Sequence, residues 1–235
     1  MKLDTDLRPS ETGLHYRLRR GQPKRGLIVM LHGLSGDENV MWIFDHALPR
    51  TATVVAPRAL YNSEFGGYSW TRAVVRDQFT DVDFQEAADH LQRFIDKAST
   101  LYQVDPRRVI VMGFSQGAAL SYAFSLEHPV MLCGVIALAG FLARYNRHSH
   151  RTCAARSAVQ VSTPLRSAQN ASLRYLIVHG AHDEAVPIDR AREAQSVLES
   201  RGASVEYHEH RVGHKVSAQG MKEIKHWIDK TLREC

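Results

Sequence analysis

The sequence predicts an α/β fold, a mainly parallel, twisted sheet with helices on both faces. Five apolar runs of strand length are continuous rather than alternating, which is typical of strands buried on both faces. Segments with helical periodicity lie between them, and strands that alternate with helices form a parallel sheet covered on both sides. The 235 residues suit one domain of this kind.

The predicted strands follow one another along most of the chain. "LHYRLRR" at 14–20 is expected to be an added antiparallel strand, and "SVEYHEH" at 204–210 alternates like a final strand. The continuous apolar runs lie at 27–33, 53–59, 109–115, 133–140 and 174–180.

The predicted helices carry apolar stripes at helical spacing. Segment 81–103 has a stripe of Phe84, Ala87, Ala88, Leu91, Phe94, Ile95 and Ala98. Segment 221–232 has a stripe of Met221, Ile224, Trp227, Ile228 and Leu232. A helix is also expected over 116–127, and another begins after Pro187 and ends near Gly202.

Composition narrows the class of protein. The chain is 44% hydrophobic and 23% charged, as in ordinary globular proteins. It has no apolar run of about 18 residues and no apolar leader, so we expect no stable membrane insertion. Cys133, Cys153 and Cys235 match no zinc-site spacing and no disulfide framework, which favours a reducing cytoplasm. We see no linker, and therefore expect a single domain over residues 1–235.

One basic insert interrupts this pattern. Segment 143–173 has no clear periodicity and no Asp or Glu, and its arginines equal the net charge of +5 of the whole chain. These arginines are Arg144, Arg147, Arg151, Arg156 and Arg166. Such a local charge does not indicate nucleic-acid binding, which requires a basic face on a binding fold. The insert is expected beside the active-site mouth, either to attract anionic substrates or as a solvated loop.

A serine between glycines stands where a strand becomes a helix. "GFSQG" matches G-x-S-x-G, a sharp turn that exposes the hydroxyl of Ser115 above the carboxyl ends of the strands. Because side chains two residues either side of the serine would clash, these positions are glycines. Ser115 is therefore predicted to be a nucleophile.

A serine nucleophile needs a base and an acid. Where a G-x-S-x-G turn lies above an α/β sheet, they follow the serine in the order Ser, acid, His. Of the histidines after the insert, His214 lies in the loop between the last strand and the last helix. The others lie in or beside strands or on the last helix (His179, His182, His208, His210 and His226). We therefore predict His214 as the base. Asp183 is the predicted acid, and Glu184 is the alternative in the same loop.

Acyl transfer also needs two N–H groups aimed at the carbonyl oxygen as it becomes an anion. Gln116 follows the nucleophile and supplies one, and Leu34 in "LHGLSGDE" is expected to supply the other. His32 precedes that turn and is expected to be a structural hydrogen-bonding residue.

Four motifs, "LHGLSGDE", "GFSQGAAL", "VHGAHDEAVP" and "VGHKVS", occur together in one order. From about Leu27 to Ile228 the chain resembles the phospholipase/carboxylesterase family of α/β hydrolases, which includes acyl-protein thioesterases. The resemblance implies the α/β-hydrolase fold and a cofactor-free, metal-free serine hydrolase for carboxylic esters or thioesters. It also implies Ser115, Asp183 and His214 as the triad. The oxyanion loop departs from the family where a glycine commonly follows Leu34.

The substrate is less defined. "EFGGYSWTR" lies where the family places part of its pocket, so Phe65, Tyr68 and Trp70 line an acyl site or cap the core, and Val186 is a further candidate. We expect a small-molecule acyl ester or thioester as substrate, no nucleic acid as partner, and leave a homodimer open. Alternatives are a lysophospholipase, a dienelactone-hydrolase-like enzyme, although those carry Cys at the Ser115 position, and a non-catalytic binding protein on this scaffold.

Overall fold

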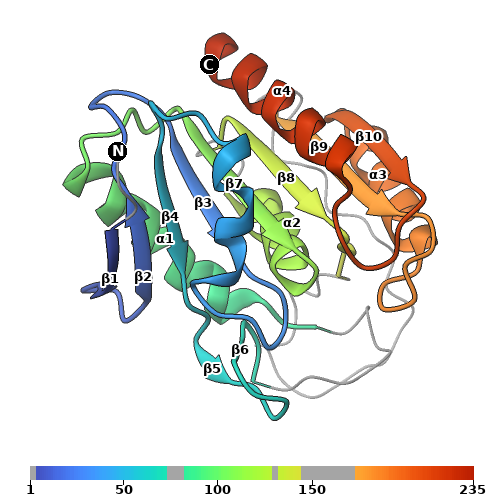
Figure 1. Ribbon diagram of the computed structural model, residues 1–235, viewed down its shortest axis with the longest axis horizontal. Helices are drawn as coiled ribbons and strands as arrows, with labels where there is room; N and C mark the ends of the chain where they lie inside the picture. Colours follow the sequence, from blue (N-terminus) through green and yellow to red (C-terminus); the bar gives the residue numbers. More distant parts are fainter. Residues whose placement is uncertain (1–3, 73–81, 129–131, 144–172) are drawn as a thin grey trace, which may run out of the picture.

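The computed structural model describes residues 4–72, 82–128, 132–143 and 173–235, and its centre is an eight-stranded sheet (Figure 1). The strand order is β1-β2-β4-β3-β7-β8-β9-β10. Six strands from β4 to β10 in that order are parallel, whereas β2 pairs antiparallel with β4 and β1 antiparallel with β2. The bounds are β1 Asp4–Pro9, β2 His15–Arg19, β3 Leu27–Leu31, β4 Thr53–Pro57, β7 Val109–Phe114, β8 Gly134–Leu138, β9 Arg174–Gly180 and β10 Ser204–His210.

The continuous apolar runs are strands buried on both faces, as predicted. In β3, Leu27, Val29 and Leu31 join the core on one face of the sheet, and Ile28 and Met30 join the core on the other. Successive side chains of a strand point to opposite faces, so a strand covered on both sides needs apolar residues at every position. The expected antiparallel strand near the start is β2.

Helices cover the two faces of the sheet (Figure 1). The first core contains residues of α1 (Gln85–Leu101), α2 (Gln116–Glu127) and α3 (Ile188–Ser200). The second contains residues of the short 3-10 helix η1 (Val40–Ala47) and of α4 (Ala218–Glu234). Every residue of the predicted α1 stripe is buried. The α/β-hydrolase arrangement expected from the sequence is therefore present.

Three small features were not predicted. β1 reads "DTDLRP", too polar for the buried-strand pattern. η1 is one short helix, and β5 (Tyr61–Asn62) pairs with β6 (Tyr68–Ser69) as a hairpin of two-residue strands. Such short elements give no periodicity that a sequence window can detect.

The expectation that the cysteines do not pair is wrong. Cys133 and Cys235 form a disulfide whose Cα atoms are 6.1 Å apart, a normal separation for such a bond. The bond joins the last residue of the chain to the residue before β8. A separation of 102 residues carries no local spacing signal, and only the packing of α4 on the sheet brings the two together.

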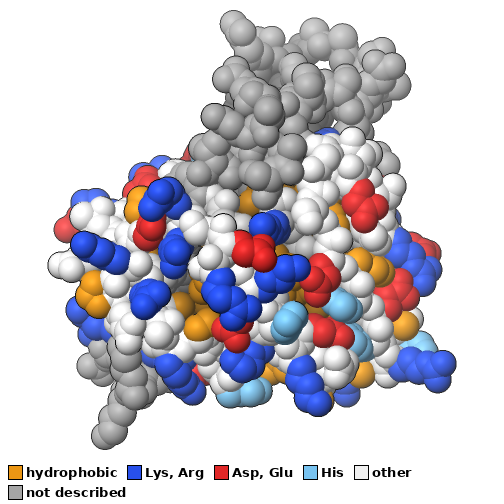
Figure 2. Space-filling model, turned by 90° about the horizontal axis from the view of Figure 1, so that it is seen from above, with side chains coloured by type: hydrophobic (Ala, Val, Ile, Leu, Met, Phe, Trp, Pro, Cys, Tyr) orange, Lys and Arg blue, Asp and Glu red, His pale blue; other side chains and the backbone are white. Residues whose placement is uncertain are grey.

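The surface seen in Figure 2 mixes Lys and Arg with Asp and Glu, and its hydrophobic side chains are scattered. None of the described helices is long and apolar enough to span a membrane. The arginines of the basic insert lie in 144–172, outside the described residues, so its expected position beside the site stays a prediction.

Candidate active site

Ser115 occupies a strained turn between β7 and α2. Its φ of 54° and ψ of −116° lie in a region that non-glycine residues rarely adopt. The flanking glycines make the turn sterically allowed, because a Cβ on Gly113 would lie 2.1 Å from the Gly117 carbonyl oxygen. A Cβ on Gly117 would lie 2.2 Å from the Leu31 oxygen. The geometry is that of a nucleophile elbow.

Asp183 lies in the turn after β9, with its side chain fully buried. Its Oδ1 accepts hydrogen bonds from the backbone N–H groups of Ala185 and Val186, both at 2.9 Å. Its Oδ2 faces the imidazole of His214 at 2.7 Å from Nδ1. A buried carboxylate held in this way is oriented by the backbone and leaves one oxygen for the histidine.

His214 lies between β10 and α4, and its side chain is 28% exposed. Because the Asp183 carboxylate accepts, Nδ1 carries the proton and Nε2 is left as the proton acceptor. The ring packs against Phe114, the residue before Ser115, with 4.9 Å between ring centroids. Within the described part of the chain, neither Ser115 Oγ nor His214 Nε2 has a hydrogen-bond partner. Such contacts often form only when substrate is bound.

Two backbone N–H groups near Ser115 are free to donate. Those of Leu34 and Gln116 make no hydrogen bond to any described residue. Gln116 is the first residue of α2, where N–H groups have no partner inside the helix. Leu34 follows Gly33, whose added Cβ would lie only 3.3 Å from Ser115 Cβ. Both donors therefore border Ser115.

Comparison with known proteins identifies the family of this chain. The sequence profile of the phospholipase/carboxylesterase family matches residues 18–232. The chain belongs to this family.

Individual relatives are distant but cover nearly the full length. Acyl-protein thioesterase 1 of Saccharomyces cerevisiae is 26% identical, over 90% of this chain and 95% of the yeast protein. A "probable inactive carboxylesterase" of Oryza sativa subsp. japonica is 28% identical, over 89% of this chain and 86% of the rice protein. The crystal structure of a Mesorhizobium loti carboxylesterase matches with a TM-score of 0.75 at 22% identity, over 97% and 98% of the two chains. That likeness shows the shared fold.

A cluster of hydrogen bonds supports the turn that carries Ser115. It consists of the bonds of the Gln116 side chain and of the Trp70 indole, and we call it the Gln116 bracket. The buried Gln116 side chain accepts from the Trp70 N–H at 3.0 Å and donates to the hydroxyls of Ser69 and Thr71 at 3.1 and 3.2 Å. The Trp70 indole N–H donates to the His32 carbonyl at 2.8 Å. The bracket joins the end of β6 and the residues after it to both the Ser115 turn and the turn that follows β3. The sequence pattern predicts a role for the Gln116 backbone N–H but not for its side chain.

His32 has the structural role expected of it. Its Nδ1 donates to the Gly33 carbonyl at 2.7 Å, and its Nε2 accepts from the Ala59 N–H at 3.0 Å. Burial lowers the pKa of this imidazole. His32 is therefore neutral and holds the turn that precedes Leu34.

The expected substrate-binding residues lie in different surroundings. Phe65 is 50% exposed, whereas Trp70 is 1% exposed and belongs to the core, one of the two roles the sequence allows. Tyr68 is half-buried beneath the Arg58 guanidinium, 4.5 Å from its ring centre. Val186 is buried, and its backbone rather than its side chain contacts the acid. An acyl-binding role for these four residues stays a prediction.

Two of the other histidines after the insert pair with glutamates. His210 bonds to Glu223 of α4 at 2.9 Å, and His208 bonds to Glu206 at 3.0 Å. His179 is different, because its Nε2 lies 3.4 Å from Asp183 Oδ2. The prediction from the sequence excludes His179 as the base and does not include this contact. The only sequence signal for the contact is that His179 lies four residues before Asp183.

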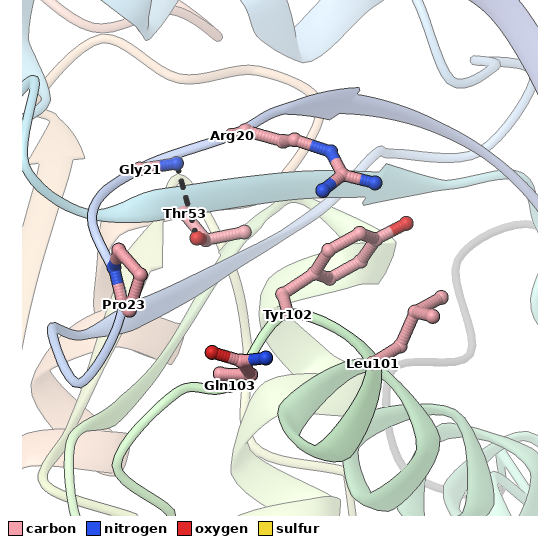
Figure 3. Close-up of a pocket in the computed structure, with 7 residues that line it drawn as sticks. All are labelled: Arg20, Gly21, Pro23, Thr53, Leu101, Tyr102 and Gln103. Carbon is pink, nitrogen blue, oxygen red and sulfur yellow. Dashed lines mark hydrogen bonds between the residues drawn. The ribbon is translucent and has the colours of Figure 1, made fainter.

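A cavity of about 160 Å³ lies away from these residues (Figure 3). It is lined by Arg20, Gly21, Pro23, Thr53, Leu101, Tyr102 and Gln103. Thr53 is the first residue of β4, so the cavity is at the amino ends of the parallel strands, opposite Ser115. Among the residues that line this cavity, the Arg20 guanidinium lies over the Tyr102 ring.

Proposed function

We propose that this protein is a cofactor-free serine hydrolase that cleaves carboxylic esters or thioesters through an acyl-enzyme on Ser115. Asp183 and His214 complete the triad, and the N–H groups of Leu34 and Gln116 form the oxyanion hole. We also propose that residues 1–235 form one domain. The observation that carries the proposal is the 2.7 Å hydrogen bond between Asp183 and His214 beside a strained serine.

Acylation begins with attack of Ser115 Oγ on the carbonyl carbon of the substrate. His214 Nε2 takes the serine proton, and Asp183 stabilises the imidazolium that results. The carbonyl oxygen becomes an anion, which the two unpaired N–H groups stabilise at the positive end of α2. His214 then protonates the departing alcohol or thiol. Water, deprotonated by the same imidazole, hydrolyses the acyl-enzyme and restores the serine.

A thioester substrate has support of its own. Several yeast relatives carry the name acyl-protein thioesterase 1, including the one that matches 90% of this chain. The proposed chemistry is the same for both substrates, because only the leaving group changes. A side-by-side series of acyl esters, acyl thioesters and lysophospholipids, compared by kcat/KM, would assign the class.

The competing reading is a non-catalytic member of the family, since the rice relative is named probably inactive. The two readings differ at Ser115. A fluorophosphonate should label the wild-type protein at Ser115, with peptide mapping to locate the adduct. Ser115→Ala should lose the label and lower ester turnover by about 10⁶-fold. Ser200→Ala, an exposed serine on α3, should change neither. A folded Ser115→Ala protein with more than a tenth of wild-type activity would refute the triad.

A further inference from the structure

His179 is a buried histidine that the proposed chemistry does not use. It lies on β9, and its side chain is fully buried. Its Nε2 lies 2.8 Å from the Val186 carbonyl oxygen and 3.4 Å from Asp183 Oδ2. Its other nitrogen, Nδ1, is buried and has no hydrogen-bond partner among the described residues. A buried unpaired ring nitrogen costs free energy and calls for an explanation.

The surroundings fix the tautomer of the ring. A carbonyl oxygen only accepts, so the bond to Val186 requires the proton on Nε2 and leaves Nδ1 bare. Three titratable groups act on this ring: Asp183, His214 and Glu209. Burial outweighs the attraction of the two carboxylates and lowers the pKa of His179, so the ring is neutral. A neutral ring places its Nε2 3.4 Å from Asp183 Oδ2 without adding a cation beside His214.

We propose that His179 is a positioning residue, whose Nε2–H closes the 183–186 turn through the Val186 carbonyl and fixes Asp183 Oδ2 toward His214. The carboxylate is then held on both oxygens. Oδ1 accepts from Ala185 and Val186, and Oδ2 is confined between the two imidazoles. This inference rests on the proposed function, because it assigns His179 a part in orienting the proposed acid.

Two substitutions at position 179 distinguish the contribution of the Nε2–H group from that of the rest of the imidazole ring. His179→Gln can place an N–H at the position of Nε2, whereas His179→Asn can place one only near Nδ1. We expect His179→Gln to keep kcat within about 5-fold of wild type, and His179→Asn to lower kcat by about 10²-fold with KM little changed, as for a misplaced catalytic group. His208→Asn is the control, because His208 bonds to Glu206 and not to Asp183. Equal kcat losses in His179→Gln and His179→Asn, or no loss in a folded His179→Asn protein, would overturn the proposal.

The wild-type protein gives a second test that does not depend on a variant folding. Imidazole ¹⁵N NMR of the wild-type protein at pH 7.5 should show His179 protonated at Nε2 only. The downfield resonance of the His214 Nδ1 proton, which reports its bond to Asp183, should persist in His179→Gln and shift in His179→Asn. A proton on His179 Nδ1 would refute the inference. If Ser115→Ala stayed active, the proposed function would fail first, whatever the state of His179.

Discussion

At the scale of single residues, two neutral imidazoles lie next to the groups assigned to the chemistry. His32 supports the turn before Leu34, and His179 supports Asp183, each with its pKa lowered by burial. The unfolded chain protonates both below about pH 6.5, whereas the folded protein resists protonation. The unfolded state therefore binds more protons in that range, and acid favours unfolding.

The free energy of unfolding should accordingly fall from pH 7.5 to pH 5, with a limiting slope of about 1.4 kcal/mol per pH unit for each histidine. Urea denaturation at half-unit steps measures it. His179→Gln removes one titrating group, so its stability should depend less steeply on pH than that of wild type. Asp37 and Glu38 have lowered pKa values, so the stability that they contribute is lost mainly below about pH 5, where the experiment stops. Parallel curves for the two proteins would contradict the assignment.

At the scale of elements, the sequence predicts what has a long pattern. Apolar periodicity predicts the buried strands and the α1 stripe, and Pro187 marks the start of α3. The two glycines around Ser115 predict the sharp turn, because a Cβ at either position would clash. The bracket of Gln116 could not be predicted, because it joins residues 45 to 47 positions apart. Side-chain contacts between distant elements depend on the packed fold, which no local window contains.

The bracket gives a prediction for the strand–turn–helix unit. Gln116→Met keeps the shape but leaves the buried Trp70 N–H without its acceptor, which should cost about 1–3 kcal/mol of stability. It should also lower kcat, because the turn that aims the Gln116 N–H loses its support.

Ser125→Ala is the matched control for that variant. Ser125 is buried near the other end of α2, where it bonds to the Tyr122 carbonyl and the Tyr175 hydroxyl. It should lower stability in the urea experiment without lowering kcat. If Gln116→Met lost stability but kept wild-type kcat, the bracket would serve the fold alone.

At the scale of the whole molecule, the carboxyl ends and the amino ends of the parallel strands carry different features. Ser115, Asp183 and His214 follow the carboxyl ends of β7, β9 and β10, the edge where open α/β sheets place their chemistry. The disulfide lies at the amino ends of the strands, because Cys133 directly precedes β8. A link at the amino ends can stabilise the fold without touching the reacting groups.

Breaking the link should therefore change stability and leave catalysis intact. A disulfide restricts the unfolded chain, and native disulfides typically contribute about 2–4 kcal/mol. Cys235→Ser should lower the free energy of urea unfolding by that amount without a reductant, and dithiothreitol should bring wild type down to the same value. Cys153→Ser is the control for stability and should unfold as wild type does, because the bond uses the other two cysteines. Esterase kcat should stay constant in Cys235→Ser, since the disulfide lies away from the carboxyl ends of the strands. Equal stability of wild type and Cys235→Ser without reductant would show that the two sulfur atoms are not bonded in solution.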